Sequence, residues 1–201
     1  MSGRTPPLRP APPPASTVEL PSVASQMRKL GLLLLLVVVV TVVAIIITPK
    51  LHNPGLLANG TAAPSFTLSA DDGNQHTLPA AAPGGATVVL FIEATCPHCQ
   101  EEAPKVCDLA RQHPHTTFVG VGAAEENSDA LRAFRGAHMA QCGASLFPLL
   151  VDSSADVTHR YVVAVVPTIY VIDASGKVAY SGTGTDGVDA ATPVIDRLER
   201  G

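Results

Sequence analysis

The sequence predicts an α/β protein, with a mixed central sheet flanked by helices, that follows a single transmembrane helix near the N-terminus. A 19-residue uncharged run, 30–48, predicts that helix and divides the 201-residue chain into a short tail and a longer part that suits one domain. In the longer part, runs typical of strands alternate with helical patterns. One buried-strand pattern, 87–92, leads directly into Cys96 and Cys99 at the start of a helical pattern.

The N-terminal tail, residues 1–29, has the composition of a disordered or polyproline-like segment. It holds seven prolines and no aromatic residue. Such a segment buries too little apolar surface to offset the entropy that is lost on ordering. We therefore expect a solvated tail rather than a proline-rich ligand for a partner.

The run 30–48 is long enough to cross a membrane as a helix. At 1.5 Å per residue it spans about 28 Å, close to the roughly 30 Å of a bilayer core. Its valines and isoleucines favour strands in water, but a lone span in lipid must satisfy its own backbone, so a helix is favoured. Because no small-x-small cleavage site follows directly, the pattern favours an uncleaved signal-anchor over a cleaved signal peptide.

Basic residues flank the run asymmetrically and predict its orientation. Four of them precede it against one acid, Glu19, whereas only Lys50 and His52 follow directly. The positive-inside rule then places the N-terminus in the cytoplasm and residues 49–201 outside. The expected location is the cell membrane, with a single pass and an extracytoplasmic domain.

The predicted outer part is acidic and contains every cysteine. It keeps 9 of the 13 Lys/Arg and 16 of the 17 Asp/Glu, a net charge of −7 with histidines neutral. This balance argues against nucleic acid or an anionic membrane surface as a partner. The cysteines stand at 96, 99, 107 and 142, and an even count in an oxidising compartment allows two disulfides.

Residues 49–61 are rich in turn formers and lack periodicity, so we expect a linker before a domain over 62–201. The domain's elements follow from local patterns. We expect a hairpin over 66–78, a strand over 87–92, a helix over 97–112, a strand over 116–122, a helix over 128–138, a strand over 147–152, a short helix over 156–161, a second hairpin over 167–180, a loop over 182–187 and a last helix over 188–200.

Specific residues support these elements. An Asp-Gly turn between two alternating runs predicts the first hairpin, and the continuous apolar run 87–92 indicates a strand covered on both faces. Pro97 falls in the first turn of its helix, where proline is tolerated. Pro104 lies in the interior of the same helix and is expected to kink it. Ser128 is the expected N-cap of the next helix.

The strand-to-helix junction places Cys96 where a helix N-terminus stabilises a thiolate through unpaired backbone N–H groups and the helix dipole. Pro97 and His98, between the cysteines, are the residues expected to tune that thiolate. Cys96 is then the nucleophile. Cys99, one turn further on, is the resolving thiol that breaks the mixed disulfide with a substrate. No cofactor is expected, because the Cys96–Cys99 disulfide is itself the redox group.

The motif and several separated landmarks resemble the membrane-anchored TlpA/ResA-like thiol-disulfide oxidoreductases of thioredoxin-like fold. The family pattern is roughly Trp-Cys-x-Pro-Cys-x-x-Glu-x-Pro, and Glu102 and Pro104 stand in register with the two cysteines. The other landmarks are separate from the motif. They are Phe66-Thr67-Leu68 with Asp72-Gly73, Val166-Pro167-Thr168, and Ile172-Asp173 with Gly176-Lys177. The resemblance covers residues 62 to about 187.

The resemblance implies roles for residues beyond the cysteines. Glu102 would be an acid under the active site that tunes the cysteines or moves a proton. Pro167 would be cis and face Cys96, so that the Val166 backbone pairs with an extended substrate segment. The implied partners are thiols or disulfides of exported proteins and a separate redox protein, and cytochrome c maturation is one such setting.

Two departures from the family pattern affect substrate contact and direction. Thr95 stands at the substrate-docking edge where the family has Trp, which removes a flat apolar surface beside Cys96. The dipeptide Pro97-His98 is that of DsbA-type oxidants, in which a strongly stabilised thiolate favours the reduced form. The TlpA/ResA resemblance suggests a reductant instead, so the sequence leaves the direction of exchange open.

The sequence also leaves open the state of the other two cysteines and the class of the domain. Cys107 and Cys142 form either a structural disulfide, two buried thiols or a relay to the active pair. The domain could also be a redox-inert binding scaffold, or a copper or zinc module, although zinc normally takes four ligands from two paired clusters and no second Cys-x-x-Cys exists. A peroxiredoxin motif is absent, because Glu93 and Val89 replace its Thr/Ser and Pro.

Overall fold

The computed structural model describes residues 27, 31–41, 55–78, 85–123 and 126–200, in two compact units that divide after His52. In the first unit, residues 31–41 are helical. Across the described ranges, no helix is both long and apolar enough to cross a membrane. The predicted span 30–48 includes residues 30 and 42–48, which lie outside those ranges, as do most of the tail and residues 49–54 of the predicted linker.

The second unit contains seven strands and four helices in the described ranges, nearly all where the sequence predicts them. The strands are β1 (Phe66–Ser69), β2 (Gln75–Leu78), β3 (Thr87–Ile92), β4 (Thr117–Gly122), β5 (Leu149–Val151), β6 (Thr168–Ile172) and β7 (Val178–Thr183). The helices are α2 (Pro97–Gln112), α3 (Ser128–His138), α4 (Asp156–Arg160) and α5 (Gly184–Glu199).

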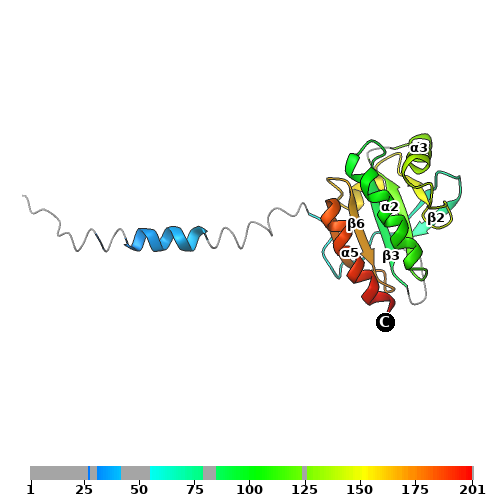
Figure 1. Cartoon of the computed structure of the whole chain (residues 1–201). Helices are drawn as coiled ribbons and strands as arrows, with labels where there is room; N and C mark the ends of the chain where they lie inside the picture. The colour runs from blue at the N-terminus through cyan, green and yellow to red at the C-terminus, as the bar shows by residue number, and fades with distance from the viewer. Residues whose placement is uncertain (1–26, 28–30, 42–54, 79–84, 124–125, 201) are drawn as a thin grey trace, which may run out of the picture. The chain divides into compact units, whose positions relative to one another are not determined.

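Five of the strands form the predicted mixed sheet, in the order β5-β4-β3-β6-β7, and β1 and β2 form a separate hairpin. The central strand β3 pairs in parallel with β4 and antiparallel with β6. The sheet therefore presents the carboxyl ends of β3 and β4 at one edge, and the cysteine motif follows β3 at that edge. Figure 1 shows α2 and α5 lying side by side over the sheet.

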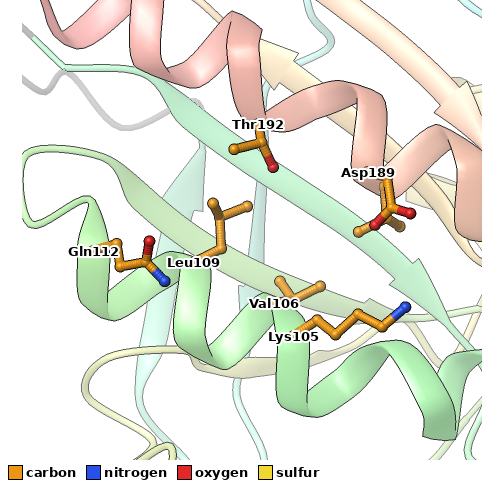
Figure 2. A pocket seen from close by; sticks show the side chains of 7 residues that line it. Lys105, Val106, Leu109, Gln112, Asp189 and Thr192 are labelled. Atoms are coloured by element: carbon orange, nitrogen blue, oxygen red, sulfur yellow. The ribbon is translucent and has the colours of Figure 1, made fainter.

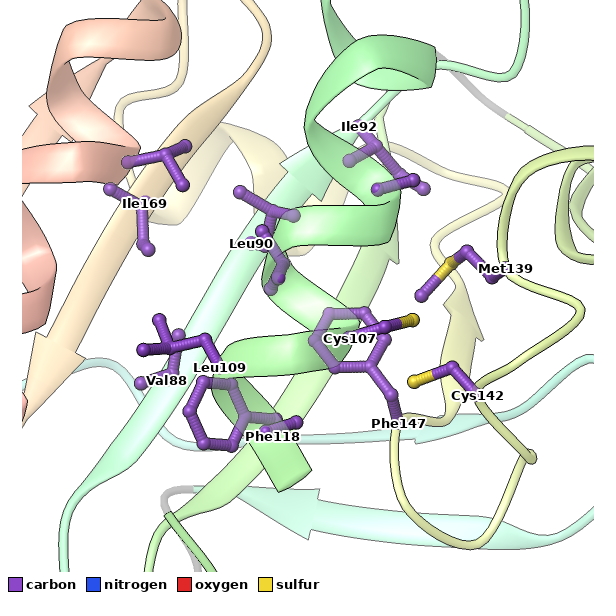
Figure 3. Packing of buried hydrophobic residues seen from close by; sticks show 14 of the residues in the cluster. Val88, Leu90, Ile92, Cys107, Leu109, Phe118, Met139, Cys142, Phe147 and Ile169 are labelled. Atoms are coloured by element: carbon purple, nitrogen blue, oxygen red, sulfur yellow. The ribbon is translucent and has the colours of Figure 1, made fainter. Parts of the chain in front are cut away.

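Strand β3 is buried on both faces because its side chains alternate between two hydrophobic clusters. Val88, Leu90 and Ile92 belong to the cluster that also contains the buried faces of α2 and α5 (Figure 3). Val89 and Phe91 point the other way and belong to the second cluster. Because β3 is paired with β4 and β6 and packed on both faces, its end, and with it the cysteine motif, is fixed by the core.

The second cluster lies under the β1–β2 hairpin and α4, and its centre is aromatic. Tyr161 packs edge-on against Phe66 and Tyr170, with ring centroids 5.8 Å and 5.2 Å away. The Tyr161 hydroxyl donates to the Pro64 carbonyl (2.9 Å), and the Tyr170 hydroxyl donates to the Tyr161 carbonyl (2.5 Å). These buried bonds anchor the start of the loop that leads from Tyr161 to Pro167.

Two local predictions are wrong. The N-cap of α3 is Asn127 rather than Ser128, because the Asn127 carboxamide accepts from the backbone N–H groups of Asp129 and Ala130, both at 3.0 Å. The predicted loop 182–187 does not exist as a loop, since β7 continues to Thr183 and α5 begins at the next residue. Gly184 favours this abrupt change, because its φ of +69° lies in the left-handed region that glycine adopts without strain.

Candidate active site

Cys96 caps the N-terminus of α2, as predicted. It has an extended backbone, its sulfur accepts a hydrogen bond from the Cys99 backbone N–H at 3.3 Å, and Pro97 opens the helix. Pro97 has no N–H to satisfy, so its position costs the helix nothing. A sulfur that faces unpaired N–H groups at the positive end of a 16-residue helix is placed to carry negative charge.

The two sulfurs of the motif differ in access. Cys96 is half-buried at the surface, whereas Cys99 is only 1% exposed and belongs to the core. Burial raises the pKa of the Cys99 thiol above its usual range, and its hydrogen bond with Cys96 raises it further. The arrangement therefore offers one accessible sulfur for attack and one shielded sulfur that stays protonated.

The loop before β6 lies beside Cys96. The Val166–Pro167 peptide bond is cis, as the resemblance implies, and the Cys96 thiol donates to the Val166 carbonyl at 3.8 Å. The Thr168 hydroxyl donates to the Val165 carbonyl at 2.6 Å, and this bond fixes the loop to the start of β6. The backbone of Val166 thus lies beside the accessible sulfur of Cys96. An extended peptide that pairs with this backbone would have its own sulfur close to Cys96.

The segment in front of Cys96 is held by two side chains that the sequence did not single out. Glu126 accepts from the Ala94 N–H at 2.9 Å, and the Gln100 side chain donates to the Ala94 carbonyl at 2.9 Å. Gly122 permits the first contact, because a Cβ there would lie 2.8 Å from the Glu126 Cβ. Both polar groups of Ala94 are satisfied, so the chain enters the motif in one conformation.

Glu102 lies one turn after Cys99 on the buried side of α2 and is fully buried, as the resemblance implies. Its Oε1 accepts from the Lys105 ammonium at 2.8 Å, which raises the pKa of Lys105. Its Oε2 has no hydrogen-bond partner in the described structure. A buried carboxylate oxygen without a partner is costly, and such atoms are concentrated at functional sites.

Figure 2 shows Lys105 among the side chains that line a pocket between α2 and α5. The pocket is lined by Lys105, Leu109, Asp189 and Thr192 among others, and the charge of Asp189 also favours the protonated lysine. Neither motif cysteine lines it. Lys105 therefore connects the buried Glu102 to solvent on the side of α2 that faces α5.

The structure places the other two predicted residues on the surface. His98 is exposed, and its Nδ1 lies 3.6 Å from the Glu101 Oε2; in the described part of the chain it makes no hydrogen bond to Cys96. Thr95 is exposed and lines an apolar hollow of about 360 Å³ between the motif and α3, with Phe134 at its base. Thr95 thus adjoins an apolar surface beside Cys96, but it supplies little of that surface itself.

Cys107 and Cys142 lie away from the motif, buried in the cluster between α2 and the sheet. Both side chains are at most 1% exposed, and their sulfur atoms point toward one another (Figure 3). All four cysteines are thiols in this structure. The hydrogen bond with Cys142, together with burial, raises the pKa of Cys107, so this thiol is a poor nucleophile where it stands.

The family comparisons agree with this geometry. Residues 59–181 match the model of the AhpC/TSA family. The chain belongs to the AhpC/TSA family. It is 30% identical over 133 residues to the thiol-disulfide oxidoreductase ResA of Geobacillus thermodenitrificans, covering 64% of this chain and 71% of that protein. ResA of Bacillus subtilis is 28% identical over 129 residues, covering 64% and 69%.

Solved structures extend the match to most of the second unit. MTB DsbF, solved in mixed oxidized and reduced forms, is 28% identical with a TM-score of 0.57 and covers 66% of this chain and 94% of its own. A putative thiol:disulfide interchange protein DsbE from Chlorobium tepidum has a TM-score of 0.57 and 24% identity, over 71% and 95% of the two chains, and supports the fold alone.

Together these matches confirm a ResA-like member of the AhpC/TSA family with the thioredoxin-like fold. The protein is a thiol-disulfide oxidoreductase. Thiol-disulfide exchange by a pair of cysteines requires one accessible thiol and a second thiol close to it. Within the described residues, the cysteine motif after β3 is the site whose geometry provides this.

Proposed function

We propose that Cys96 attacks the disulfides of exported proteins and that Cys99 resolves the resulting mixed disulfides. The single observation that carries this proposal is the asymmetry at the start of α2. The Cys96 sulfur is accessible, accepts the Cys99 N–H at 3.3 Å and lies beside the Val166 carbonyl, while the Cys99 sulfur is buried one turn below. Attack and resolution are divided between the two thiols in this way.

The exchange conserves atoms and electrons. The Cys96 thiolate attacks one sulfur of a substrate disulfide, so that a Cys96–substrate disulfide forms and the other substrate sulfur leaves as a thiolate. Cys99 then loses its proton and attacks the Cys96 sulfur. This step releases the second substrate thiolate and leaves the Cys96–Cys99 disulfide. Two electrons pass to the substrate, and the reverse sequence oxidises a dithiol substrate. The reduction potential of the pair decides which direction dominates.

Glu102 is proposed to serve the resolving step. It is buried one turn from Cys99, and its Oε2 has no partner in the described structure. A carboxylate in that position can accept the proton that Cys99 must lose before it attacks. The ion pair with Lys105 connects this carboxylate to the surface.

We also propose a single-pass membrane protein whose catalytic domain, residues 62–201, is extracytoplasmic. The support is the uncharged run 30–48 and the basic residues in front of it. In this arrangement residues 1–29 form a cytoplasmic tail and 49–61 a linker. The partners are then exported proteins on one side of the exchange and a separate redox protein that restores the Cys96–Cys99 pair.

An oxidising compartment also favours a disulfide between Cys107 and Cys142. The two thiols are in contact, buried, and located on different elements. Their bond would form when an oxidised dithiol partner accepts two electrons and two protons from them, and it would connect α2 to the segment after α3. This pair is proposed as structural, because neither sulfur reaches the surface.

The test is to trap substrates with the Cys99→Ala variant in the native membrane. Without the resolving thiol, exported proteins should accumulate as mixed disulfides at Cys96, and a reductant should release them. The Cys96→Ala/Cys99→Ala double variant is the matched control and should trap nothing. Equal recovery from the single and double variants would favour a redox-inert binding domain over the exchange function.

A further inference from the structure

A pocket of about 240 Å³ lies next to the edge where the substrate is proposed to pair. Its lining includes Val166, whose carbonyl faces Cys96, together with Glu93, His159, Val163 and Val165. A peptide that pairs with Val166 and presents its sulfur to Cys96 must pass the mouth of this pocket. One of its side chains can then enter the pocket.

Glu93 is the unusual member of this lining. It follows β3 directly, and its backbone carbonyl accepts from the Cys96 N–H at 3.1 Å, so its position is coupled to the motif. The residue is half-buried. Across the described ranges its carboxylate has neither an ion pair nor a hydrogen bond. A partly desolvated carboxylate without a cation is unfavourable, and a cation supplied by a ligand would remove that cost.

The rest of the pocket cannot supply this cation well. The Thr158 hydroxyl already donates to the buried Asp152 at 2.8 Å. His159 lines the pocket but is exposed to solvent, unlike the half-buried Glu93. The remaining lining side chains are valines and alanines. The pocket therefore combines apolar walls with one anionic group.

Lysine and arginine fit this combination. Each has an aliphatic stem that packs against apolar side chains and a cationic end that pairs with a carboxylate. Val163 and Val165 would contact the stem, and Glu93 would bind the charged end. Val165 is 50% exposed, so part of the apolar lining is accessible from solvent.

We propose that Glu93 is a specificity-determining residue that selects substrates with a lysine or arginine close to the cysteine that Cys96 attacks. This inference rests on the proposed exchange function. It adds a substrate class, namely exported proteins with a basic residue beside the reactive disulfide. The net charge of −7 on residues 49–201 favours the approach of such substrates.

The experiment measures attack by the reduced full chain, in detergent at pH 8, on short peptides whose single cysteine carries a 5-thio-2-nitrobenzoate group. Attack on the peptide sulfur releases the coloured thiolate and forms the Cys96–peptide disulfide, so each event is counted. The peptides differ at one position, which is scanned from two residues before the cysteine to two after it. That position holds lysine, norleucine or glutamate.

At one scanned position the wild type should react with the lysine peptide about fivefold to tenfold faster than with the norleucine peptide, as a partly buried ion pair of roughly 1 kcal/mol predicts. Glu93→Gln should bring that ratio close to one and leave the norleucine rate within about twofold. The unchanged norleucine rate shows that the variant folds. Asp108→Asn removes the same charge from an exposed site further along α2 and should keep the wild-type ratio.

Two results with Glu93→Gln would overturn the inference. One is a lysine preference that Glu93→Gln leaves intact. The other is an equal loss for all three peptides, which would show that Glu93 acts on the cysteines rather than on the substrate. A wild type that reacts with no peptide would instead contradict the proposed exchange function, whereas equal reaction with all peptides would contradict only the specificity.

Discussion

Both cysteine pairs have members on α2, but one pair lies at the surface end of the helix and the other is buried in the core. Cys96 and Cys99 stand at the N-terminus of α2, where one sulfur reaches the surface and accepts a backbone N–H. Cys107 lies further along α2, and Cys142 lies opposite it; both are buried in the cluster between α2 and the sheet. The same chemical group is thus placed for exchange at one end of the helix and shielded from exchange in the middle of it. Access and local charge, rather than sequence spacing alone, separate the two roles.

Removing the accessible thiol should have the largest effect. Cys96→Ser is expected to lower the rate of disulfide exchange by at least about a thousandfold, because a hydroxyl is not ionised at neutral pH and cannot form the mixed disulfide. Reduction of a model disulfide protein measures this rate. Cys107→Ala should keep the rate within about threefold. Comparable losses in both variants would remove the distinction between the pairs.

Breaking the buried pair should act on stability instead. If Cys107 and Cys142 are joined, the bond closes a loop of about 35 residues and contributes roughly 4 kcal/mol to the free energy of unfolding. Urea unfolding of a Cys96→Ala/Cys99→Ala background, with and without a reductant, measures this difference. A Cys107→Ala/Cys142→Ala version of that background should not respond to the reductant. A midpoint that is independent of reductant in both proteins would show that the buried pair stays reduced.

An ion pair supports the segment that contains Cys142. Its loss should affect stability and not exchange, as expected for the region of the buried pair. Arg135 binds both carboxylate oxygens of the buried Asp71 (2.7 Å and 2.9 Å) and donates to the Phe147 carbonyl at 3.1 Å. Asp71→Asn leaves the guanidinium without its counter-charge and should lower the free energy of unfolding by about 3 kcal/mol. The exchange rate at low temperature should be unchanged. A large loss of exchange activity in the folded variant would show that the two regions are coupled.

The raised pKa of Cys99 predicts how the resolving step depends on pH. Burial is the largest cause of the shift and persists in the mixed disulfide, so Cys99 remains mostly protonated up to high pH. Its thiolate fraction should rise about tenfold per pH unit from pH 6 to pH 9 without a plateau, and the resolution rate should rise with it, less steeply at low pH where Glu102 assists. A pH jump from a mixed disulfide formed in acid measures this rate.

Glu102→Gln removes the proposed proton acceptor and should slow resolution most at low pH, where few Cys99 thiolates form without help. Glu101→Gln is the control, since it removes the same charge from the exposed neighbouring residue of α2 and should leave the resolution rate unchanged. A resolution rate that does not change with pH in the wild type would contradict the assignment of Cys99 as a shielded, protonated thiol.

Local sequence patterns predicted the half of the site that is contiguous in the chain. The apolar run of β3, Pro97 and the cysteine spacing together define a strand, a turn and a helix start, and each depends on neighbouring residues. The position of Val166 followed from the family resemblance rather than from its own neighbours. The cap of α3 was misplaced by one residue because Asn127 and Ser128 are both good caps.

The contacts that position the site were not predicted, because they join distant residues. Glu126 reaches Ala94 across 32 residues, and Arg135 reaches Asp71 across 64. No local pattern distinguishes these side chains from solvated surface charges. One signal was available: Glu93 and Glu126 follow the neighbouring parallel strands β3 and β4, whose carboxyl ends share an edge of the sheet.

A redox titration of the full chain in glutathione buffers, with each cysteine read by differential alkylation and mass spectrometry, distinguishes the two cysteine pairs. Cys96 and Cys99 should titrate together at a potential between about −270 mV and −120 mV, and Cys107 and Cys142 should stay joined to below about −300 mV. A value near the lower limit of the first range would indicate a reductant and one near the upper limit an oxidant. Titration of Cys107–Cys142 in that range, with Cys96–Cys99 inert, would show that the buried pair and not the motif is the redox site.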